Sequence, residues 1–310
     1  MSGIACVGEC MLELTNLPNG DFRMAYGGDT LNTAVYMARL GSLVRFITAV
    51  GNDAYSANML AGWQSENVGS DTVFVDDKHS SGLYAIQTDE HGERSFNYWR
   101  SDSAAKHLFH SSDSYHALLA SFDMVYFSGI TLSLMSDTSF DALLKRLSEI
   151  RKEGVKVVFD LNYRPKNWHS AEAAKSRIDH FLQVVDIALP SFDDEQLLFD
   201  DKDVDTCIQR YRSCGVSEIV LKHGENGCYV STPLIGDKRS HSIQHFPVKN
   251  LISPIDTTAA GDSFNAGYLA ERLNAGSIAD AVTRAQSCAA LVIQHRGAIV
   301  DKHLFQDANI

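Results

Sequence analysis

Asp256-Thr-Thr-Ala-Ala-Gly-Asp262, which runs into Ser-Phe-Asn-Ala-Gly-Tyr-Leu269, is the stretch of this chain with the most specific chemical content. Small residues precede a segment with helical spacing, so several backbone N–H groups lie at the start of a predicted helix. Such groups have no intrahelical partner and lie at the positive end of the helix dipole, where anions bind. Asp262 could accept a hydroxyl proton there while the amides stabilise charge on a transferring phosphoryl group. The local pattern fits equally well an aspartate that only stabilises its own helix.

Outward from this stretch, short β-branched runs alternate with helical segments. The predicted strands are residues 4–7, 44–49, 124–128, 155–160, 187–190 and 219–222. The clearest predicted helices are residues 30–40, 140–153 and 171–185. This alternation indicates an α/β protein with a largely parallel sheet that is covered by helices on both faces.

One region departs from that alternation. Residues 82–88 and 94–100 are strand-like runs on either side of residues 89–93, which predicts a β-hairpin. The alternation of period two places three side chains on one face: Phe96, Tyr98 and Arg100. Residues 11–26 also look extended, and together with the hairpin they would form a small sheet that acts as a lid. The alternative is an antiparallel edge of the main sheet. In either case residues 1–310 are predicted to form a single domain.

The composition excludes several classes of protein. With 310 residues, 27 Lys+Arg and 39 Asp+Glu, the formal net charge is −12, which argues against a nucleic-acid-binding protein. No apolar run approaches the roughly 18 residues that a membrane helix needs, and the first residues lack the basic character of a signal peptide. Six scattered cysteines without a Cys-x-x-Cys pair indicate free thiols in a reducing cytoplasm. The 12 histidines form no tight ligand pair in the sequence, so no structural metal site is expected.

A second glycine-containing stretch, Gly27-Gly28-Asp29-Thr30-Leu31-Asn32, also opens a predicted helix. Paired glycines let a ligand approach the backbone closely, and Asn32 could hydrogen-bond a polyol. Alone, this pattern more often marks a simple turn. Two common nucleotide-binding motifs are absent from the sequence: no Gly-x-Gly-x-x-Gly follows the first predicted strand, and no P-loop pattern occurs.

Taken together, Gly27-Gly28 with Asn32 near the start and residues 256–262 near the end resemble the two signatures of ribokinase-like (phosphofructokinase B) sugar kinases. The resemblance covers essentially the whole chain. It implies a three-layer sandwich with a mostly parallel central sheet and a small β-sheet lid. It also implies ATP-dependent phosphorylation of a sugar with Mg²⁺. Asp262 would be the catalytic base, and the amides of Ala259, Ala260 and Gly261 would form the anion hole.

Within this family, residues 8–14, 27–33, 93–100 and 159–165 are similar to kinases that phosphorylate the 6-hydroxyl of the sugar acid 2-keto-3-deoxygluconate. A sugar acid needs cationic recognition of its carboxylate, for which an arginine offers a bidentate fork. The substrate site that we expect consists of Gly28, Asp29, Asn32, Tyr84, Tyr98, Arg100, Arg164 and Asp262. Ordinary packing of the tyrosines and solvent exposure of the arginines are the alternatives. Fructose, 2-keto-3-deoxygalactonate and a non-catalytic sugar-binding role also remain open.

The nucleotide site follows from the resemblance alone. It would contain Asn162, Arg164, Ser191, Lys222, Gly224, Glu225, Gly227, Ala259, Gly261 and Gln286, with Gln286 near the adenine or ribose. The glycines of the 222–228 segment would also suit any β-turn. An exposed lid sheet would in addition offer a surface for a homo-oligomer.

The sequence departs from the family pattern at two positions. Ala259 stands where the family usually has glycine, and since alanine disfavours positive φ, we expect a negative φ there. The family's Asn-x-x-Glu motif, which organises Mg²⁺ and phosphate, reads Ser191-Phe-Asp-Asp194 here. Asp194 would then replace the glutamate and reach the metal through water.

Overall fold

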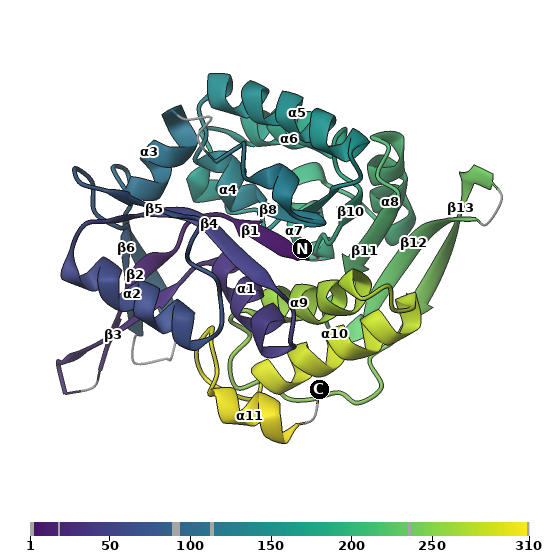
Figure 1. Ribbon diagram of the computed structural model, residues 1–310. Coiled ribbons are helices and arrows are strands. Elements are labelled where there is room, and N and C mark those ends of the chain that lie inside the picture. The colour runs from purple at the N-terminus through teal and green to yellow at the C-terminus, as the bar shows by residue number, and fades with distance from the viewer. Residues whose placement is uncertain (1–2, 18, 89–93, 112–114, 235–236, 309) are drawn as a thin grey trace.

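The computed structural model describes residues 3–17, 19–88, 94–111, 115–234, 237–308 and 310. The strands of its main sheet are β1 (Ile4–Val7), β4 (Val44–Gly51), β5 (Val73–Asp76), β8 (Met124–Ser128), β9 (Lys156–Asp160), β10 (Ile187–Ala188), β11 (Glu218–Lys222), β12 (Cys228–Leu234) and β13 (Asp237–Phe246). They form a 9-stranded sheet in the order β13-β12-β11-β10-β9-β8-β1-β4-β5 (Figure 1). Neighbours from β11 to β5 pair in parallel, whereas β12 and β13 extend one edge with antiparallel pairing.

Helices cover both faces of this sheet (Figure 1). One layer contains α3 (Ala104–Ser111), α4 (Gly129–Ser133), α5 (Asp137–Lys152), α6 (Ala171–Leu182), α7 (Phe192–Phe199) and α8 (Val204–Ser213). The other contains α1 (Asp29–Arg39), α2 (Ala54–Ser65), α9 (Ala260–Leu273), α10 (Ile278–Val292) and α11 (Lys302–Asp307). Short 3-10 turns lie at Leu119–Ser121, Pro165–Asn167 and Gly224–Asn226. Among the described helices, none is both long enough and apolar enough to cross a membrane.

The sandwich forms because the central strands are apolar on both sides. In β1, Ala5 and Val7 belong to the core under one helix layer, while Ile4 and Cys6 belong to the core under the other. All four residues are fully buried, and burying each large side chain stabilises the fold by roughly 1.5–3 kcal/mol. The continuous apolar run, without polar alternation, is the expected signature of a parallel sheet covered on both faces. The predicted three-layer α/β fold is confirmed.

The predicted elements all occur, with ends that differ by at most three residues, and several of the differences have local causes. Val155 does not begin β9, because its N–H donates instead to Ile150 O at the end of α5. Strand β10 ends at Ala188, two residues before Pro190, which has no N–H to donate. Helix α5 starts earlier than expected because the Ser136 hydroxyl accepts a hydrogen bond from Ser139 N–H and caps it.

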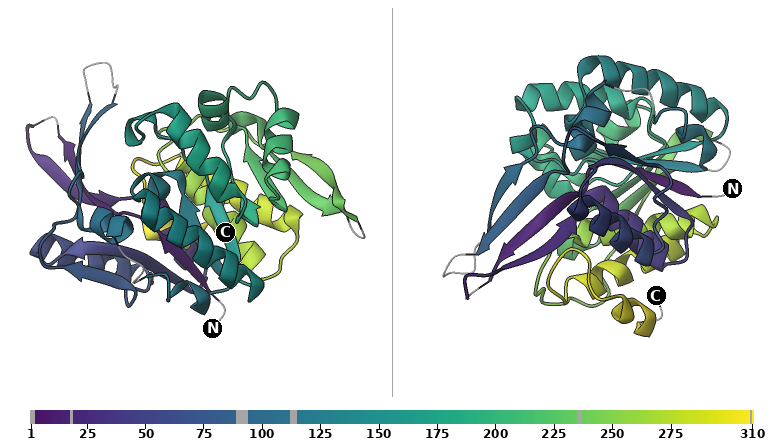
Figure 2. Two further views of the ribbon diagram at one scale, coloured as in Figure 1. Left: turned by 90° about the horizontal axis from the view of Figure 1, so that it is seen from above. Right: turned by 60° about the vertical axis from the view of Figure 1, so that its left-hand side comes forward.

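A separate 4-stranded sheet, here called the lid sheet, projects from the body (Figure 2). Its strands are β2 (Met11–Asn16), β3 (Phe22–Gly27), β6 (Leu83–Thr88) and β7 (Arg94–Trp99), in the order β3-β2-β6-β7. The alternative of an antiparallel edge on the main sheet is therefore wrong. Tyr84 and Tyr98 are direct cross-strand partners, and their rings together with that of Phe96 share one face, as the period-two pattern predicts. The predicted turn at 89–93 lies outside the described residues.

The turn before α9 corrects one expectation. Ala259 has φ 59° and ψ 17°, a left-handed conformation, and not the negative φ that alanine favours. The surrounding turn imposes it: Ala260 N–H donates to Thr257 O at 3.1 Å, and the Asp256 carboxylate accepts from the Thr258 N–H and hydroxyl. A left-handed non-glycine residue costs roughly 1–2 kcal/mol. The hydrogen bonds of the turn therefore hold Ala259 in a left-handed conformation that glycine adopts more easily, at this cost in stability.

We expect Ala259→Gly to stabilise the protein by up to about 1 kcal/mol, because glycine removes the Cβ clash in the left-handed region. Chemical denaturation measures the effect. Ala57→Gly is the matched control: Ala57 is exposed inside α2, so the same change should destabilise by about 0.5–1 kcal/mol. Equal losses for the two variants would contradict a strained Ala259.

Candidate functional site

The carboxyl ends of β1, β9 and β11 meet the N-termini of α1 and α9 at one end of the sheet. Two hydrogen bonds tie these elements together: Asn32 Nδ2 donates to Asp262 Oδ2 at 2.9 Å, and Asn162 Nδ2 donates to Asp29 Oδ2 at 2.8 Å. Residues that are far apart in the sequence thus form one polar cluster. Parallel sheets place ligand sites at this end of their strands.

Asp262 lies in the first turn of α9 and is buried. Burial, followed by the nearby Asp29 charge, raises the pKa of Asp262 to about 8, while the Asn32 hydrogen bond opposes the rise. Burial likewise raises the pKa of Asp29. A carboxylate with its pKa near neutrality is well matched to general-base work. Its placement therefore favours a catalytic role over simple helix capping.

Gly28 is required by a close backbone approach. Its backbone is fully extended, and a Cβ built on it would lie 2.2 Å from Glu9 O. Only glycine fits between the end of β1 and the start of α1. The side chains of Asp29 and Asn32 then point from the first turn of α1 to Asn162 and Asp262. The Gly-Gly turn is thus structural, and it positions the polar residues that follow it.

A buried ion pair stabilises the centre of the site. Lys222 Nζ lies 3.1 Å from Asp160 Oδ2 and 3.0 Å from Asn265 Oδ1, and Asn265 Nδ2 donates to the same Asp160 oxygen at 2.6 Å. A Cβ on Gly261 would lie 3.5 Å from Lys222 Nζ, so the ammonium also neighbours the anion-binding turn. Lys222, which was predicted for the nucleotide site, therefore lies at the site, but the Asp160 carboxylate balances its charge.

Two of the three predicted anion-hole N–H groups form no hydrogen bond within the described chain. The N–H groups of Ala259 and Gly261 donate to no other group in the part of the chain that the structure describes. Ala260 N–H already bonds Thr257 O, because the left-handed turn closes there. Of the three predicted anion-hole amides, the one of Ala260 therefore already has a hydrogen-bond partner inside the turn.

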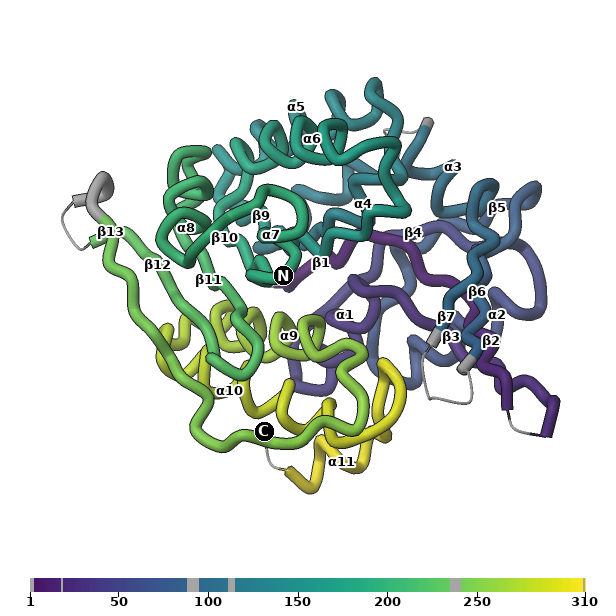
Figure 3. The backbone as a smooth tube through the Cα atoms, turned by 180° about the vertical axis from the view of Figure 1, so that it is seen from behind, coloured from purple at the N-terminus to yellow at the C-terminus, as the bar shows by residue number. Residues whose placement is uncertain are grey.

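A cavity of about 740 Å³ adjoins this turn. Its lining includes most of the predicted nucleotide residues: Ser191, Lys222, Gly224, Glu225, Gly227, Gly261 and Gln286. Apolar residues of the segment between β13 and α9, among them Leu251 and Ile252, complete it opposite Ala289 and Ile293 of the α10 region. Figure 3 shows this segment running along α10 before it enters α9. An apolar cavity beside free backbone amides suits a base at one end and phosphates at the other.

The 222–228 segment acts first as a turn. Gly224 and Gly227 have φ values of 52° and 88°, and a Cβ on Gly227 would lie 2.1 Å from Phe246 O. The glycines are therefore needed to join β11 and β12, and they also line the cavity. Gln286 Nε2 donates to Phe246 O at 3.1 Å, which fixes its amide at the cavity wall.

Four residues predicted for the nucleotide and metal sites lie outside this cavity lining: Asn162, Arg164, Asp194 and Ala259. Arg164 Nη1 donates to Tyr163 O at 2.7 Å and to Asp194 Oδ1 at 3.3 Å, and its side chain is half exposed. Burial raises the pKa of Asp194, against the effect of the Arg164 guanidinium. Asn162 is engaged with Asp29. The structure thus pairs the predicted metal-site aspartate with the predicted carboxylate-binding arginine.

On the lid side, both predicted anion-binding groups contact glutamates. The Tyr84 hydroxyl donates to Glu13 Oε2, and the Arg100 guanidinium forms an ion pair with the buried Glu9. A Cβ on Gly27 would contact the Tyr84 hydroxyl, so this tyrosine lies against the Gly-Gly turn. Tyr98 is largely exposed. The lid residues are thus linked to the site through Glu9, Glu13 and Gly27.

The sequence analysis assigned no role to four residues that hold the site together: Glu9, Glu13, Asp160 and Asn265. Asp160 follows the three buried apolar residues 157–159 at the end of β9, and Asn265 lies one helical turn after Asp262. A charged residue at a strand's carboxyl end and a polar residue at i+3 on a buried helix are signals that could have found both.

The comparisons with known proteins agree with this geometry. The model of the pfkB family carbohydrate kinases matches residues 1–303. A 2-dehydro-3-deoxygluconokinase of Dickeya dadantii is 42% identical over 305 residues, which are 96% of each chain. One from Escherichia coli K12 is 43% identical over 305 residues, 96% of this chain and 97% of its own. A crystal structure of Vibrio cholerae fructokinase, in fructose, ADP and calcium ion bound form, superposes with a TM-score of 0.82 at 25% identity, covering 99% of this chain and 98% of its own. The resemblance inferred from the two signatures is confirmed: the chain belongs to the pfkB family of carbohydrate kinases.

Proposed function

We propose that this chain transfers the γ-phosphoryl group of ATP to the 6-hydroxyl of 2-keto-3-deoxy-D-gluconate, giving 2-keto-3-deoxy-6-phosphogluconate and ADP. This sugar acid is the 2-dehydro-3-deoxygluconate named for the relatives that share more than 40% of their residues with the chain. The observation that carries the proposal is the buried Asp262 beside the free amides of Ala259 and Gly261, at the mouth of an apolar cavity.

In this mechanism, Asp262 accepts the proton of the 6-hydroxyl as the oxygen attacks the γ-phosphorus. Asn32 orients the carboxylate, since it already donates to Asp262 Oδ2. The amides of Ala259 and Gly261 would bind the charge that spreads over the phosphoryl oxygens, and Lys222 would add a positive charge beside them. The nucleotide would occupy the cavity between the 222–228 turn and α10.

The acid end of the sugar would be recognised by Arg100, Arg164, Tyr84 and Tyr98, as the sequence predicts. Support comes from the lid sheet, where Tyr84 and Tyr98 pair across strands and Arg100 follows directly after β7. Arg100 is held by Glu9 and Arg164 by Asp194, so both guanidiniums are positioned before a substrate arrives. Residues 11–26 and 82–100 would close as a lid and exclude water.

Mg²⁺ is part of the proposal because the donor chemistry fits it. Asp160 Oδ1 is buried and accepts no hydrogen bond from the described chain. Asp194 is a second carboxylate near it, since the charge of Asp160 contributes to the raised pKa of Asp194. Oxygen ligands of this type are those that Mg²⁺ prefers. These two residues would hold the ion directly or through water, and the ion would neutralise phosphate charge.

A homo-oligomer and a cytoplasmic location are two further proposals for this chain. A homo-oligomer would use the exposed apolar residues of the lid sheet, which include Phe22, Met24 and Trp99. Sedimentation at several protein concentrations would measure it. A cytoplasmic location stays a prediction; the six cysteines are free thiols in the structure.

A substrate panel tests the proposed function. With ADP formation as the readout, 2-keto-3-deoxygluconate should give a kcat/KM far above that of fructose, because fructose lacks the carboxylate that Arg100 and Arg164 would bind. Adding 2-keto-3-deoxygalactonate, which carries the same acid group, measures the preference at C4. Equal use of fructose would overturn recognition of the carboxylate. Thermal stabilisation by the sugar acid without any ADP formation would favour a non-catalytic binding protein.

Asp262→Asn should lower kcat by about 10²–10⁴-fold, because the amide cannot accept the hydroxyl proton. Steady-state kinetics with a melting curve separate this effect from unfolding. Asp141→Asn is the matched control, since Asp141 is exposed on α5 far from the cluster, and it should leave kcat unchanged. A near-normal rate for Asp262→Asn would exclude the base role.

The pH profile should reflect the raised pKa of Asp262. Only the carboxylate accepts a proton, so kcat/KM should rise with pH, reach half of its plateau near pH 8 and level off above that pH. Asp29→Asn removes a neighbouring negative charge that helps to raise this pKa, so the rising limb should move to lower pH. A limb at the same pH in both proteins would show that Asp262 does not produce it.

Arg100→Lys should raise KM for the sugar acid by about 10-fold or more while KM for ATP stays nearly constant, because the lysine loses the bidentate fork. Arg146→Lys, a change at an exposed ion pair with Glu149 on α5, is the control. Equal increases in both KM values would place Arg100 outside the sugar site.

A further inference from the structure

The chain between α10 and α11 contains an irregular segment, residues 296–300, that lies against α1. These residues form no backbone–backbone hydrogen bond in the part of the chain that the structure describes. Backbone N–H and C=O groups that are removed from water need partners, so an irregular segment of this kind depends on side chains for them. Here the side chains come from α1 and from the anion-binding turn that precedes α9.

Tyr36 of α1 supplies the first of these contacts. Its hydroxyl donates to Ala298 O at 2.6 Å and accepts from Val300 N–H at 3.1 Å, so one oxygen binds the segment at two points. The side chain is fully buried, and its ring stacks on Phe305 of α11 with centroids 5.1 Å apart. Arg39, one turn further along α1, donates from Nη1 to Val300 O at 2.8 Å. The segment is therefore fixed to α1.

Asp256 binds the same segment from the other side. Its Oδ2 accepts a hydrogen bond from Gly297 N–H at 2.9 Å. Its Oδ1 accepts from the Thr258 N–H at 3.1 Å and from the Thr258 hydroxyl at 2.7 Å. One carboxylate thus joins segment 296–300 to the anion-binding turn at the start of α9.

The face of α1 that carries Tyr36 also contacts the proposed base. Asn32, one helical turn before Tyr36, donates to Asp262 Oδ2 at 2.9 Å, and Thr33 Oγ1 donates to Asp262 O at 3.3 Å. Burial raises the pKa of the Tyr36 hydroxyl, and the nearby Asp262 charge adds to the rise. The hydroxyl therefore stays protonated and remains a donor to the segment.

We propose that Tyr36 is a positioning residue for the phosphoryl transfer, because it holds the segment that fixes Asp256 and, through the anion-binding turn, Asp262. The inference rests on the proposed function, since that function gives Asp262 its catalytic role. The contacts form a closed circuit from α1 to Asp262, through the turn to Asp256, along segment 296–300 and back to Tyr36. A single contact between two elements still allows one of them to rotate, whereas a closed circuit fixes their relative position.

A second buried tyrosine has a hydroxyl outside this circuit. Tyr268 lies on α9, and its hydroxyl donates to Glu218 Oε1 at 2.8 Å. Glu218 begins β11, at the opposite end of that strand from Lys222, and forms an ion pair with Arg272. Among the described residues, the Tyr268 hydroxyl forms no hydrogen bond to α1 or to the anion-binding turn. Each tyrosine therefore has a buried hydrogen bond to lose, but only Tyr36 is linked to the site.

Steady-state kinetics of Tyr36→Phe with the sugar acid and ATP test the inference. The variant keeps the ring and its stacking on Phe305. We expect kcat to fall about 10-fold, because a small displacement of the turn and the base weakens contacts that form fully only in the transition state. For the same reason, KM for each substrate should change by less than about 2-fold.

Tyr268→Phe is the matched control, and it should keep its kcat while its melting temperature falls by a comparable amount. An unchanged kcat in Tyr36→Phe, or equal losses of kcat in the two variants, would overturn the positioning role. A parent protein that forms no ADP with any sugar of the panel would refute the proposed function. An active parent whose Tyr36→Phe variant keeps its kcat would refute only the present inference.

A double variant tests whether Tyr36 acts through Asp256. Asp256→Asn weakens the same circuit, because the amide has one oxygen to accept hydrogen bonds where the carboxylate has two. The kcat losses of the two single variants should therefore not multiply in Tyr36→Phe/Asp256→Asn. Losses that multiply would show independent roles and overturn the circuit.

Hydrogen exchange supplies a readout that does not depend on catalysis. The amides of Gly297 and Thr258 donate to Asp256 and not to Tyr36. Both should exchange faster in Tyr36→Phe than in the parent or in Tyr268→Phe. Unchanged exchange at these two amides would overturn the link from Tyr36 to the anion-binding turn.

Discussion

The ion pair between Lys222 and Asp160 is the contact on which the geometry of the catalytic end depends. It joins the carboxyl ends of β9 and β11, and Asn265 adds α9 to the same network. Isolated, either charge would be costly to bury, and removing one partner of such a pair typically costs 3–5 kcal/mol. With both present, the start of α9 is fixed against the sheet. The placement of Asp262 and of the anion-binding turn follows from that attachment.

How far the sequence reveals this arrangement depends on whether a feature is local. The strands, the two glycine-containing signatures and Asp262 could be predicted because their patterns occupy consecutive residues. Asp160 and Asn265 acquire their meaning only when β9 and α9 meet, so no local pattern distinguishes them from other polar residues. The φ of Ala259 was predicted wrongly for the same reason. Local preference favours a negative value, and hydrogen bonds from the surrounding turn overrule it.

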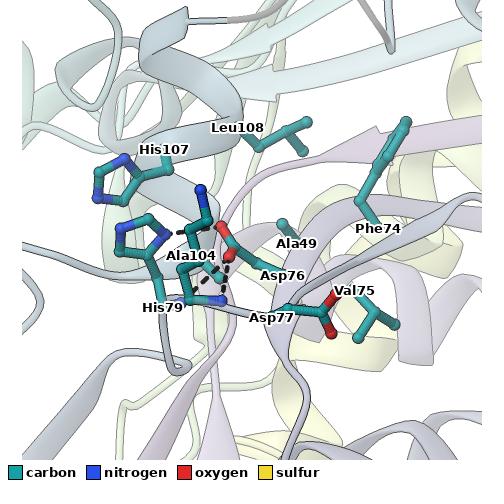
Figure 4. Close-up of a pocket in the computed structure, with 10 residues that line it drawn as sticks. Ala49, Phe74, Val75, Asp76, Asp77, His79, Ala104, His107 and Leu108 are labelled. Atoms are coloured by element: carbon teal, nitrogen blue, oxygen red, sulfur yellow. Dashed lines mark hydrogen bonds and ion pairs between the residues drawn. The ribbon is translucent and has the colours of Figure 1, made fainter.

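The stacked rings of His79 and His107, with centroids 3.5 Å apart, are a second example of a contact that no local pattern predicts (Figure 4). In the sequence, His79 and His107 are far apart and show no pattern that would predict their contact. They meet because strands β6 and β7, which lie between them in the sequence, pair antiparallel and return the chain to the body. A net charge of −12 also seemed unsuited to anionic ligands. In the structure, Lys222, Arg100 and Arg164 lie with free backbone amides at one end of the sheet, so positive charge is concentrated locally although the whole chain is acidic. Each of these guanidinium and ammonium groups forms an ion pair with an acidic residue.

The order of strands in the lid sheet has a consequence for how the chain folds. Its central pair, β2 with β6, is parallel and joins segments separated by α1, β4, α2 and β5. Closing so long a loop is entropically unfavourable until the intervening elements have packed, so this pairing forms late and after the body. The two outer hairpins are too small to be stable alone. The lid sheet is thus a late-folding unit whose opening requires the least free energy, which would suit the proposed closure of this sheet over a substrate.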